Sequence, residues 1–304
     1  MTDTSQTRLS YVPETVPGTT PATPVFKNVR MTGENFNIGS QYISSNEIRP
    51  DRNVADSTLV AREANGGFNF ELSYGSFDDM LEALLQGTWT TNVLKNGTTP
   101  KSFTFEKLMK AATDQYHRFT GQYINTLSLS VKAREAVTGS FGTMGKDGVS
   151  AQAIVTGATY TAVNSNPVIN AANNVAGLAI TGVASPFITE MNLNIDNNMR
   201  QQPVVGSLNS KGVGSGRCSV SGDLTMYFES QAAFELYLAD TYTDLTFTLG
   251  GVSNLKYVFL IPKIKLTNAE VVNGGNDQDV MLKVPFTAVY DSTNAASIKI
   301  TRTP

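Results

Sequence analysis

The sequence is poor in the residues that most enzyme and metal sites use. It contains one histidine, His117, and one cysteine, Cys218, among 304 residues. One thiol cannot form a disulfide within the chain, so a disulfide-stapled secreted module is not expected. Catalytic triads with histidine and His-rich zinc sites are limited to a single residue. We therefore expect His117 and Cys218 to be ordinary strand residues.

Charge is also scarce. Charged residues make up 16% of the chain, and the net charge is −3. No strongly basic run appears, which argues against tight non-specific binding of nucleic acid. The polar surface must come from Asn, Thr, Ser and Gln, a composition typical of β-sheets and of surfaces that become buried against other chains. Hydrophobic residues, at 40%, suffice for a core.

Long apolar segments are absent. No stretch approaches the roughly 18 apolar residues that a membrane-spanning helix needs. The segment Met1–Leu9 is polar and lacks the apolar core of a signal peptide. The sequence thus predicts a chain that folds in the cytoplasm and does not insert into a membrane.

Three motifs contain residue types found in phosphate-binding, calcium-binding or catalytic sites, but none has the spacing or context of such a site. The glycine-rich Gly212–Gly216 precedes a predicted strand and lacks the helix that phosphate loops require, so it is interpreted as a hairpin tip. The Asn276–Asp279 spacing does not fit a calcium loop. Asp78 and Asp79 suit the first turn of a helix. We predict no catalytic, cofactor-binding or metal-binding residues, and hence no enzyme.

The chain is predicted to be mainly β, with short helices. Phe68–Tyr74 alternates apolar and polar residues, the period of a half-buried strand. The period then changes, because Phe77, Met80, Leu81, Leu84 and Leu85 form one helical stripe that begins after an N-cap at Ser76 and stops at Gly87. Further strands are predicted at Val25–Met31, Phe36–Ile38, Lys101–Leu108, His117–Tyr123, Tyr123–Ala133 and Ala136–Met144.

The second part of the chain repeats the first. A shift of 154 positions places Phe70, Leu72 and Tyr74 on Leu224, Met226 and Phe228. The same shift places Ser76, Met80 and Leu84 on Ser230, Phe234 and Leu238. A strand, an N-cap and a helix stripe therefore recur in the same order at about half the chain length, as a tandem duplication requires. The predicted modules are residues 25–149 and 187–304.

Two segments lie outside these modules. Residues 1–24 contain four prolines between Tyr11 and Pro24, so they are predicted to be extended, either as a frayed terminus or as an arm that orders against a neighbouring subunit. Residues 150–186 are nearly free of charge and leave three alternatives open: a connector, a long loop or a pair of flat strands.

Three stretches carry a family resemblance. They are Tyr11–Pro21 (YVPETVPGTTP), Ser45–Arg52 (SNEIRPDR) and Gly66–Leu85 (GGFNFELSYGSFDDMLEALL). Together they resemble the major tail tube proteins of long-tailed, siphophage-like bacteriophages. The resemblance implies β-sandwich or barrel modules, each with one flanking helix and a long loop, that join their inner sheets into hollow rings. It implies no catalytic residues and no cofactor.

The resemblance also implies a function and partners. Rings would stack into the tube that delivers the genome, in a virion assembled in the host cytoplasm. The partners would be further copies of the chain, the tape-measure protein, tail-tip and tail-terminator proteins, and double-stranded DNA that passes without specific binding. Residues 1–24 and the loop at 40–65 are expected to contact the next ring. The lumen is expected to be net negative, because basic side chains would hold the phosphates.

The sequence leaves alternatives open for the number of chains in a ring and for the functional class of the protein. Two modules per chain would give six modules from three chains, whereas a decorative second half would require six chains. A capsid decoration protein or a β-sandwich adhesin is the alternative structural function. A carbohydrate-active enzyme would need a carboxylate pair and an exposed aromatic platform, and Trp89, the single tryptophan, is expected to anchor the end of the helix unit.

Overall fold

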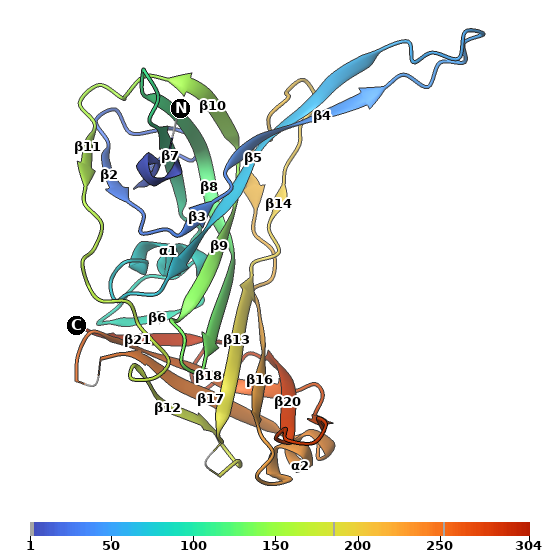
Figure 1. Cartoon of the computed structure of the whole chain (residues 1–304). Helices are drawn as coiled ribbons and strands as arrows, with labels where there is room; N and C mark the ends of the chain where they lie inside the picture. The colour runs from blue at the N-terminus through green and yellow to red at the C-terminus, as the bar shows by residue number, and fades with distance from the viewer. Residues whose placement is uncertain (1–2, 185, 252) are drawn as a thin grey trace.

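The computed structural model describes residues 3–184, 186–251 and 253–304, and most of them lie in strands (Figure 1). The chain forms two β-rich halves, one above the other in Figure 1, with a long hairpin that projects from the upper half. We call residues 3–161 the first half and residues 175–304 the second half. Within the described residues, no helix is both long and apolar enough to cross a bilayer.

The first half is built from two sheets that share one strand. The 18-residue strand β8 pairs through its first part with β7 and β10, and through its second part with β9 and β13. Gly121, at φ +62°, lies where β8 passes from one sheet to the other. The elements of this half are η1 (Thr4–Gln6), β1 (Arg8–Pro13), β2 (Val25–Asn28), β3 (Gly33–Glu34), β4 (Asn37–Ser44), β5 (Ser57–Glu71), α1 (Asp78–Leu84), β6 (Val93–Lys95), β7 (Ser102–Met109), β8 (Gln115–Lys132), β9 (Thr138–Gly145), β10 (Asp147–Gln152) and β11 (Thr159–Thr161).

Aromatic rings fill the space between these two sheets. Phe70 lies 4.4 Å from Phe77 and 5.0 Å from Phe141, measured between ring centroids, and Phe36 lies 4.9 Å from Phe105. The helix α1 covers one end of this core with Met80, Leu81 and Leu84, all buried. Burial of such large apolar side chains is the main favourable term for folding.

The second half has the same plan with fewer strands. Here β18 is the shared strand: it pairs with β17 along most of its length, with β21 near its start and with β20 near its end. Phe247 and Phe259 stack at 4.9 Å in its core. The elements are β12 (Val175–Ile180), β13 (Ile188–Asp196), β14 (Arg200–Gln201), β15 (Val213–Gly214), β16 (Ser219–Tyr227), α2 (Ala232–Leu238), β17 (Tyr242–Gly250), β18 (Lys256–Leu266), β19 (Glu270–Val272), β20 (Met281–Ala288) and β21 (Lys299–Thr303).

The N-terminal segment differs from the predicted arm. Residues Arg8–Pro13 form β1, which pairs with β7 along its whole length. Leu9 is 0% exposed and Tyr11 5% exposed, because both side chains enter the core of the first half. The prolines that suggested a free arm follow or end the strand, where a missing N–H is tolerated. This segment is therefore part of the body of the molecule.

Two further segments contain strands, one that the sequence predicts to be a loop and one whose structure the sequence leaves open. The predicted loop at 40–65 is a two-stranded hairpin, β4 with β5, because Ser40, Tyr42 and Ser44 pair with Arg62, Leu59 and Ser57. Within 150–186, β11 pairs with β2 and β12 pairs with β17. β12 thus occupies in the second half the place that β1 occupies beside β7 in the first.

The helix starts are displaced from the predicted N-caps. Phe77 and Gln231 precede α1 and α2, and neither side chain makes a capping hydrogen bond. The Ser76 hydroxyl bonds to the Ser73 hydroxyl at 2.6 Å instead, and the Ser230 hydroxyl accepts a long hydrogen bond, 3.4 Å, from the Ala232 N–H. The two predicted strands at 117–133 are the single strand β8.

Candidate assembly surfaces

The two halves share one continuous sheet. Seven consecutive residues of β8, Thr126–Lys132, pair antiparallel with β13, from Asp196 back to Glu190. On one side of this pairing, which we call the inner seam, Lys132 Nζ lies 3.2 Å from Glu190 Oε1. On the other side, Leu127, Leu129, Leu193 and Ile195 are buried. The sheet therefore runs without a break from β4 and β5 through β9, β8, β13 and β16 to β20.

A second pairing joins the halves on the opposite side of α1. Three residues of β6 pair with Thr301–Lys299 of β21. The Asn96 side chain accepts hydrogen bonds from the Ser297 and Ile298 N–H groups. We call this pairing the outer seam. The strand β6 belongs to the 17 residues that link α1 to β7. The corresponding link between α2 and β17 has only three residues, so the described residues of the second half include no counterpart of β6.

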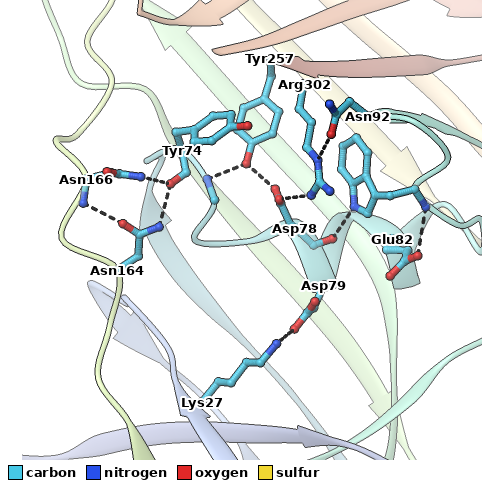
Figure 2. A network of polar contacts seen from close by, with 12 residues as sticks. Lys27, Tyr74, Asp78, Asp79, Glu82, Asn92, Asn164, Asn166, Tyr257 and Arg302 are labelled. Atoms are coloured by element: carbon cyan, nitrogen blue, oxygen red, sulfur yellow. Dashed lines mark hydrogen bonds and ion pairs between the residues drawn. The ribbon is translucent and has the colours of Figure 1, made fainter. Parts of the chain in front are cut away.

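A polar network closes the space between the two seams (Figure 2). The buried Tyr257 of β18 donates its hydroxyl hydrogen to Asp78 in the first turn of α1 and accepts the Gly75 N–H at 2.8 Å. Arg302 of β21 also donates to Asp78, and to Asn92 Oδ1 at 3.1 Å. Burial, reinforced by the nearby Asp78 carboxylate, raises the pKa of Tyr257 well above its usual range. The second half is thus locked onto the start of α1.

One face of the shared sheet is polar along its whole width. In β5, β9, β8, β13, β16 and β20, alternate residues point to this face, and Ser, Thr and Asn predominate. Asn192 donates to Asp223 at 3.0 Å, and a shallow depression there is lined by Glu190, Asp223, Glu270 and Lys283. We define this face on these strands as beginning at Asn65 in β5 and at Thr126 in β8. Its charged side chains are four carboxylates and two lysines: Glu71, Glu190, Asp196, Asp223, Lys132 and Lys283. The face is polar and slightly acidic.

Both ends of the shared sheet present strand edges. Among the described residues, β3 and β4 are paired on one side only, with β5, and β19 on one side only, with β20. Unpaired strand edges offer N–H and C=O groups to a further strand, which makes them natural sites of association. Val271 of β19 is 37% exposed at this edge.

Two hairpins extend from the sheet. The first hairpin, residues 37–64, projects from the molecule, and the second hairpin, residues 197–218, lies along the first half (Figure 1). The first hairpin exposes large apolar side chains: Tyr42 is 63% exposed, Ile43 59%, Ile48 100% and Val54 68%. Surfaces of this kind mark interaction sites.

The structure places the single histidine, cysteine and tryptophan of the chain, His117, Cys218 and Trp89, among strand and helix contacts. His117 is partly buried in β8, and burial with the nearby Lys107 ammonium lowers its pKa. Burial raises the pKa of the Cys218 thiol to about 11, so the thiolate is disfavoured near neutral pH. Trp89 folds back on α1, where its indole N–H donates to the Asp78 carbonyl at 3.2 Å. Within the described residues, no group of three or more His, Cys, Asp or Glu side chains could hold a metal ion.

The two glycine- and asparagine-rich motifs are turns and hairpin segments. Val213 and Gly214, within the motif Gly212–Gly216, form β15, the returning strand of the second hairpin, so this motif is not the tip that was predicted. Asn276–Asp279 lies in the turn before β20, where Asp277 has a φ of +67°. Sequence reasoning missed Tyr257 and Arg302, because only the fold brings them to α1, 179 and 224 positions from Asp78 in the sequence.

These features define a class of structural protein: a β-rich chain whose organised surfaces are sheet seams, free strand edges and projecting hairpins. The family model of the phage tail tube protein matches residues 4–288, so the chain belongs to the phage tail tube protein family. Membership identifies it as a structural protein of the bacteriophage virion. No curated protein matches the chain in sequence.

Proposed function

We propose that the chain assembles into closed rings, that these rings stack into a hollow tail tube, and that the tube conducts the genome into the host. The single observation that carries this proposal is the inner seam, where one half of the chain extends the sheet of the other. The free edges at β3–β4 and at β19 are the remaining ends of that sheet. Their pairing between chains would continue the sheet around a ring and leave no open edge.

Internal duplication of the chain is part of the proposal. The helices α1 and α2 are offset by 154 residues, from Asp78 to Ala232. The pairings β5–β9, β7–β8 and β8–β9 have counterparts in β16–β20, β17–β18 and β18–β20. We infer modules that begin near β1 and near β12, which revises the expected boundaries at residues 25 and 187. Three chains would then supply six modules to one ring.

The polar face is proposed to line the lumen. Its hydroxyl and amide groups can exchange hydrogen bonds with water, and its slight excess of carboxylates opposes adhesion of DNA phosphates. The tape-measure protein would occupy this lumen before the genome passes. The exposed tip of the first hairpin, with Ile48 and Val54, is proposed to reach the next ring. Tail-tip and tail-terminator proteins would bind the two ends of the stack.

Negative-stain electron microscopy of the purified chain at high concentration tests the assembly. Hollow rings or tubes with three-fold or six-fold class averages would support the proposal and decide the number of chains. Discrete monomers under all salt and concentration conditions would favour a capsid decoration protein or an adhesin, the alternatives with no need for closed rings.

The strand edge can be tested separately with Val271→Lys. A lysine at an exposed edge opposes pairing with another strand, so this variant should keep the melting temperature of the parent and lose ring formation. Val16→Lys is the matched control, because Val16 is 59% exposed in a turn away from the sheet edge. Rings formed normally by Val271→Lys would exclude the β19 edge from the interface.

A further inference from the structure

The contact between the second hairpin and the first half provides a template for a contact between chains. Gln201 of the second hairpin donates through Nε2 to the Gly145 carbonyl at 2.8 Å, at the end of β9. Arg62 of the first hairpin donates its N–H to the Leu208 carbonyl at 2.9 Å, so the two hairpins also touch each other. At the base of the second hairpin, Asn197 donates to the Leu84 carbonyl at 2.8 Å and closes over the end of α1.

The pairing registers show which residues of the repeat correspond. Gln201 pairs with Val213 as Tyr42 pairs with Leu59, and Val213 is offset from Leu59 by 154 positions, as α2 is from α1. Gln201 therefore corresponds to Tyr42. By the same reasoning, Phe141 pairs with Phe68 as Phe286 pairs with Gly222, so Gly145 corresponds to Tyr290.

Large side chains just after β20, at the end of α2 and at the start of β17 are exposed in the single chain. Tyr290 is 60% exposed, Tyr242 50% and Leu238 66%, whereas Leu84, which corresponds to Leu238, is fully buried. Two lysines of β18 connect the neighbourhoods of these residues: the Lys263 ammonium lies over the Tyr242 ring while its backbone carbonyl accepts the N–H of Val289, next to Tyr290, and Lys265 pairs with Asp240 just after α2. We call Leu238, Tyr242 and Tyr290 the α2 patch.

We propose that the first hairpin of one chain docks on the α2 patch of the next chain in the ring, with Tyr42 against Tyr290. The occupant is a second copy of this chain, because the same chain already makes the corresponding contact internally through its second hairpin. The chemistry of the two sides also agrees: the internal contact joins Gln201 to a backbone carbonyl, whereas both sides of the contact between chains are aromatic. Such a pair gains from burial of exposed rings and from their mutual packing.

The contact would also explain why α2 is less buried than α1. Besides the second hairpin, the segment after α1 covers α1, since the Gly97 N–H donates to the Leu85 carbonyl at 2.7 Å. The three-residue link after α2 provides no such cover. The junction between chains thus lacks a counterpart of the outer seam, and the hairpin would supply the missing contact. This inference rests on the proposed ring assembly.

Cysteine pairing tests the contact in full-length chains that carry Cys218→Ser. Chains with Tyr42→Cys are mixed with chains with Tyr290→Cys, oxidised mildly, and resolved by gel electrophoresis without reductant, with electron microscopy of the same sample. Chains with Ile48→Cys, from the tip of the same hairpin and fully exposed, replace Tyr42→Cys in the control. Rings together with a disulfide-linked dimer at least tenfold above the control are the expected result.

The other outcomes separate the two proposals. Rings without a dimer, or with equal dimer in the control, would overturn hairpin docking and leave the ring assembly standing. No rings and no dimer at any concentration would overturn both. As a second measurement, Tyr42→Ala should raise the concentration for half-maximal ring formation at least tenfold without a change in melting temperature, and Ile48→Ala should not. An unchanged concentration for Tyr42→Ala would also overturn the docking.

Discussion

At the scale of single residues, the junction between the halves depends on a few polar side chains that meet around Asp78. Its carboxylate receives hydrogen bonds from both Tyr257 and Arg302 of the second half. A charged acceptor strengthens such bonds, and partial burial protects them from water. The sequence offered no motif for this cluster, since its members come from three separate elements.

Tyr257→Phe should destabilise the chain by about 2 kcal/mol, the usual contribution of a buried hydrogen bond to a charged group. The ring remains in place against Tyr74, 4.9 Å away, so the packing is retained and only the hydroxyl is lost. Urea unfolding at neutral pH measures the change. Tyr42→Phe serves as the control, because Tyr42 is exposed and should show no effect. Equal stability of the two variants would show that the Asp78 network does not hold the halves together.

Alkaline pH should weaken the fold. The pKa values of Tyr11, Tyr160 and Tyr257 are raised by burial and by neighbouring carboxylates. A raised pKa in the folded state means that the folded chain binds more protons than the unfolded chain above the ordinary tyrosine pKa near 10. The contribution of these tyrosines to the free energy of unfolding is thus constant below about pH 10 and is lost as the pH rises further. Thermal unfolding between pH 8 and 11 measures the fall, which Tyr257→Phe should reduce.

At the scale of elements, the N-terminal strand completes the sheet and the core of the first half. The sequence predicted an extended segment, either a frayed terminus or an arm that orders against a neighbouring subunit. The structure instead places β1 between β2 and β7, with Leu9 and Tyr11 in the core. Deletion of residues 1–20 would remove Leu9 and Tyr11 from the core and leave one edge of β7 unpaired, so we expect loss of the fold.

Leu9→Ala should reduce the free energy of unfolding by about 3 kcal/mol, because it leaves a cavity at a fully buried site. Val16→Ala, at an exposed position nine residues before the start of β2, should change it by less than about 0.5 kcal/mol. Chemical denaturation followed by far-UV circular dichroism provides both values. A negligible effect of Leu9→Ala would show that the N-terminal strand does not contribute to the stability of the core.

At the scale of the whole molecule, the polar face of the shared sheet is the surface that we propose lines the lumen. Glu190→Lys with Asp223→Lys would turn the depression at β13, β16 and β20 basic. We expect assembled rings of this variant to retain labelled duplex DNA, with an affinity that falls as salt rises, because phosphate contacts release counterions. Asp277→Lys with Asp279→Lys adds the same charge in an exposed turn and is the control. Equal binding by both variants would argue that this face does not meet DNA.

The sequence alone determined the class of the protein. Alternation at Phe68–Tyr74 and its recurrence at Leu224–Phe228 gave half-buried strands, and the apolar stripes gave helices, because local periodicity reports which face is buried. The sequence also has only one His and one Cys, the residue types on which most catalytic triads and zinc sites depend. Only the tertiary structure decided where β1, β12 and the hairpins lie, since strand pairing joins residues far apart in the chain. It also decided the two seams. Strands pair through backbone N–H and C=O groups, which every strand has, so the sequence of one strand does not indicate which strand will pair with it.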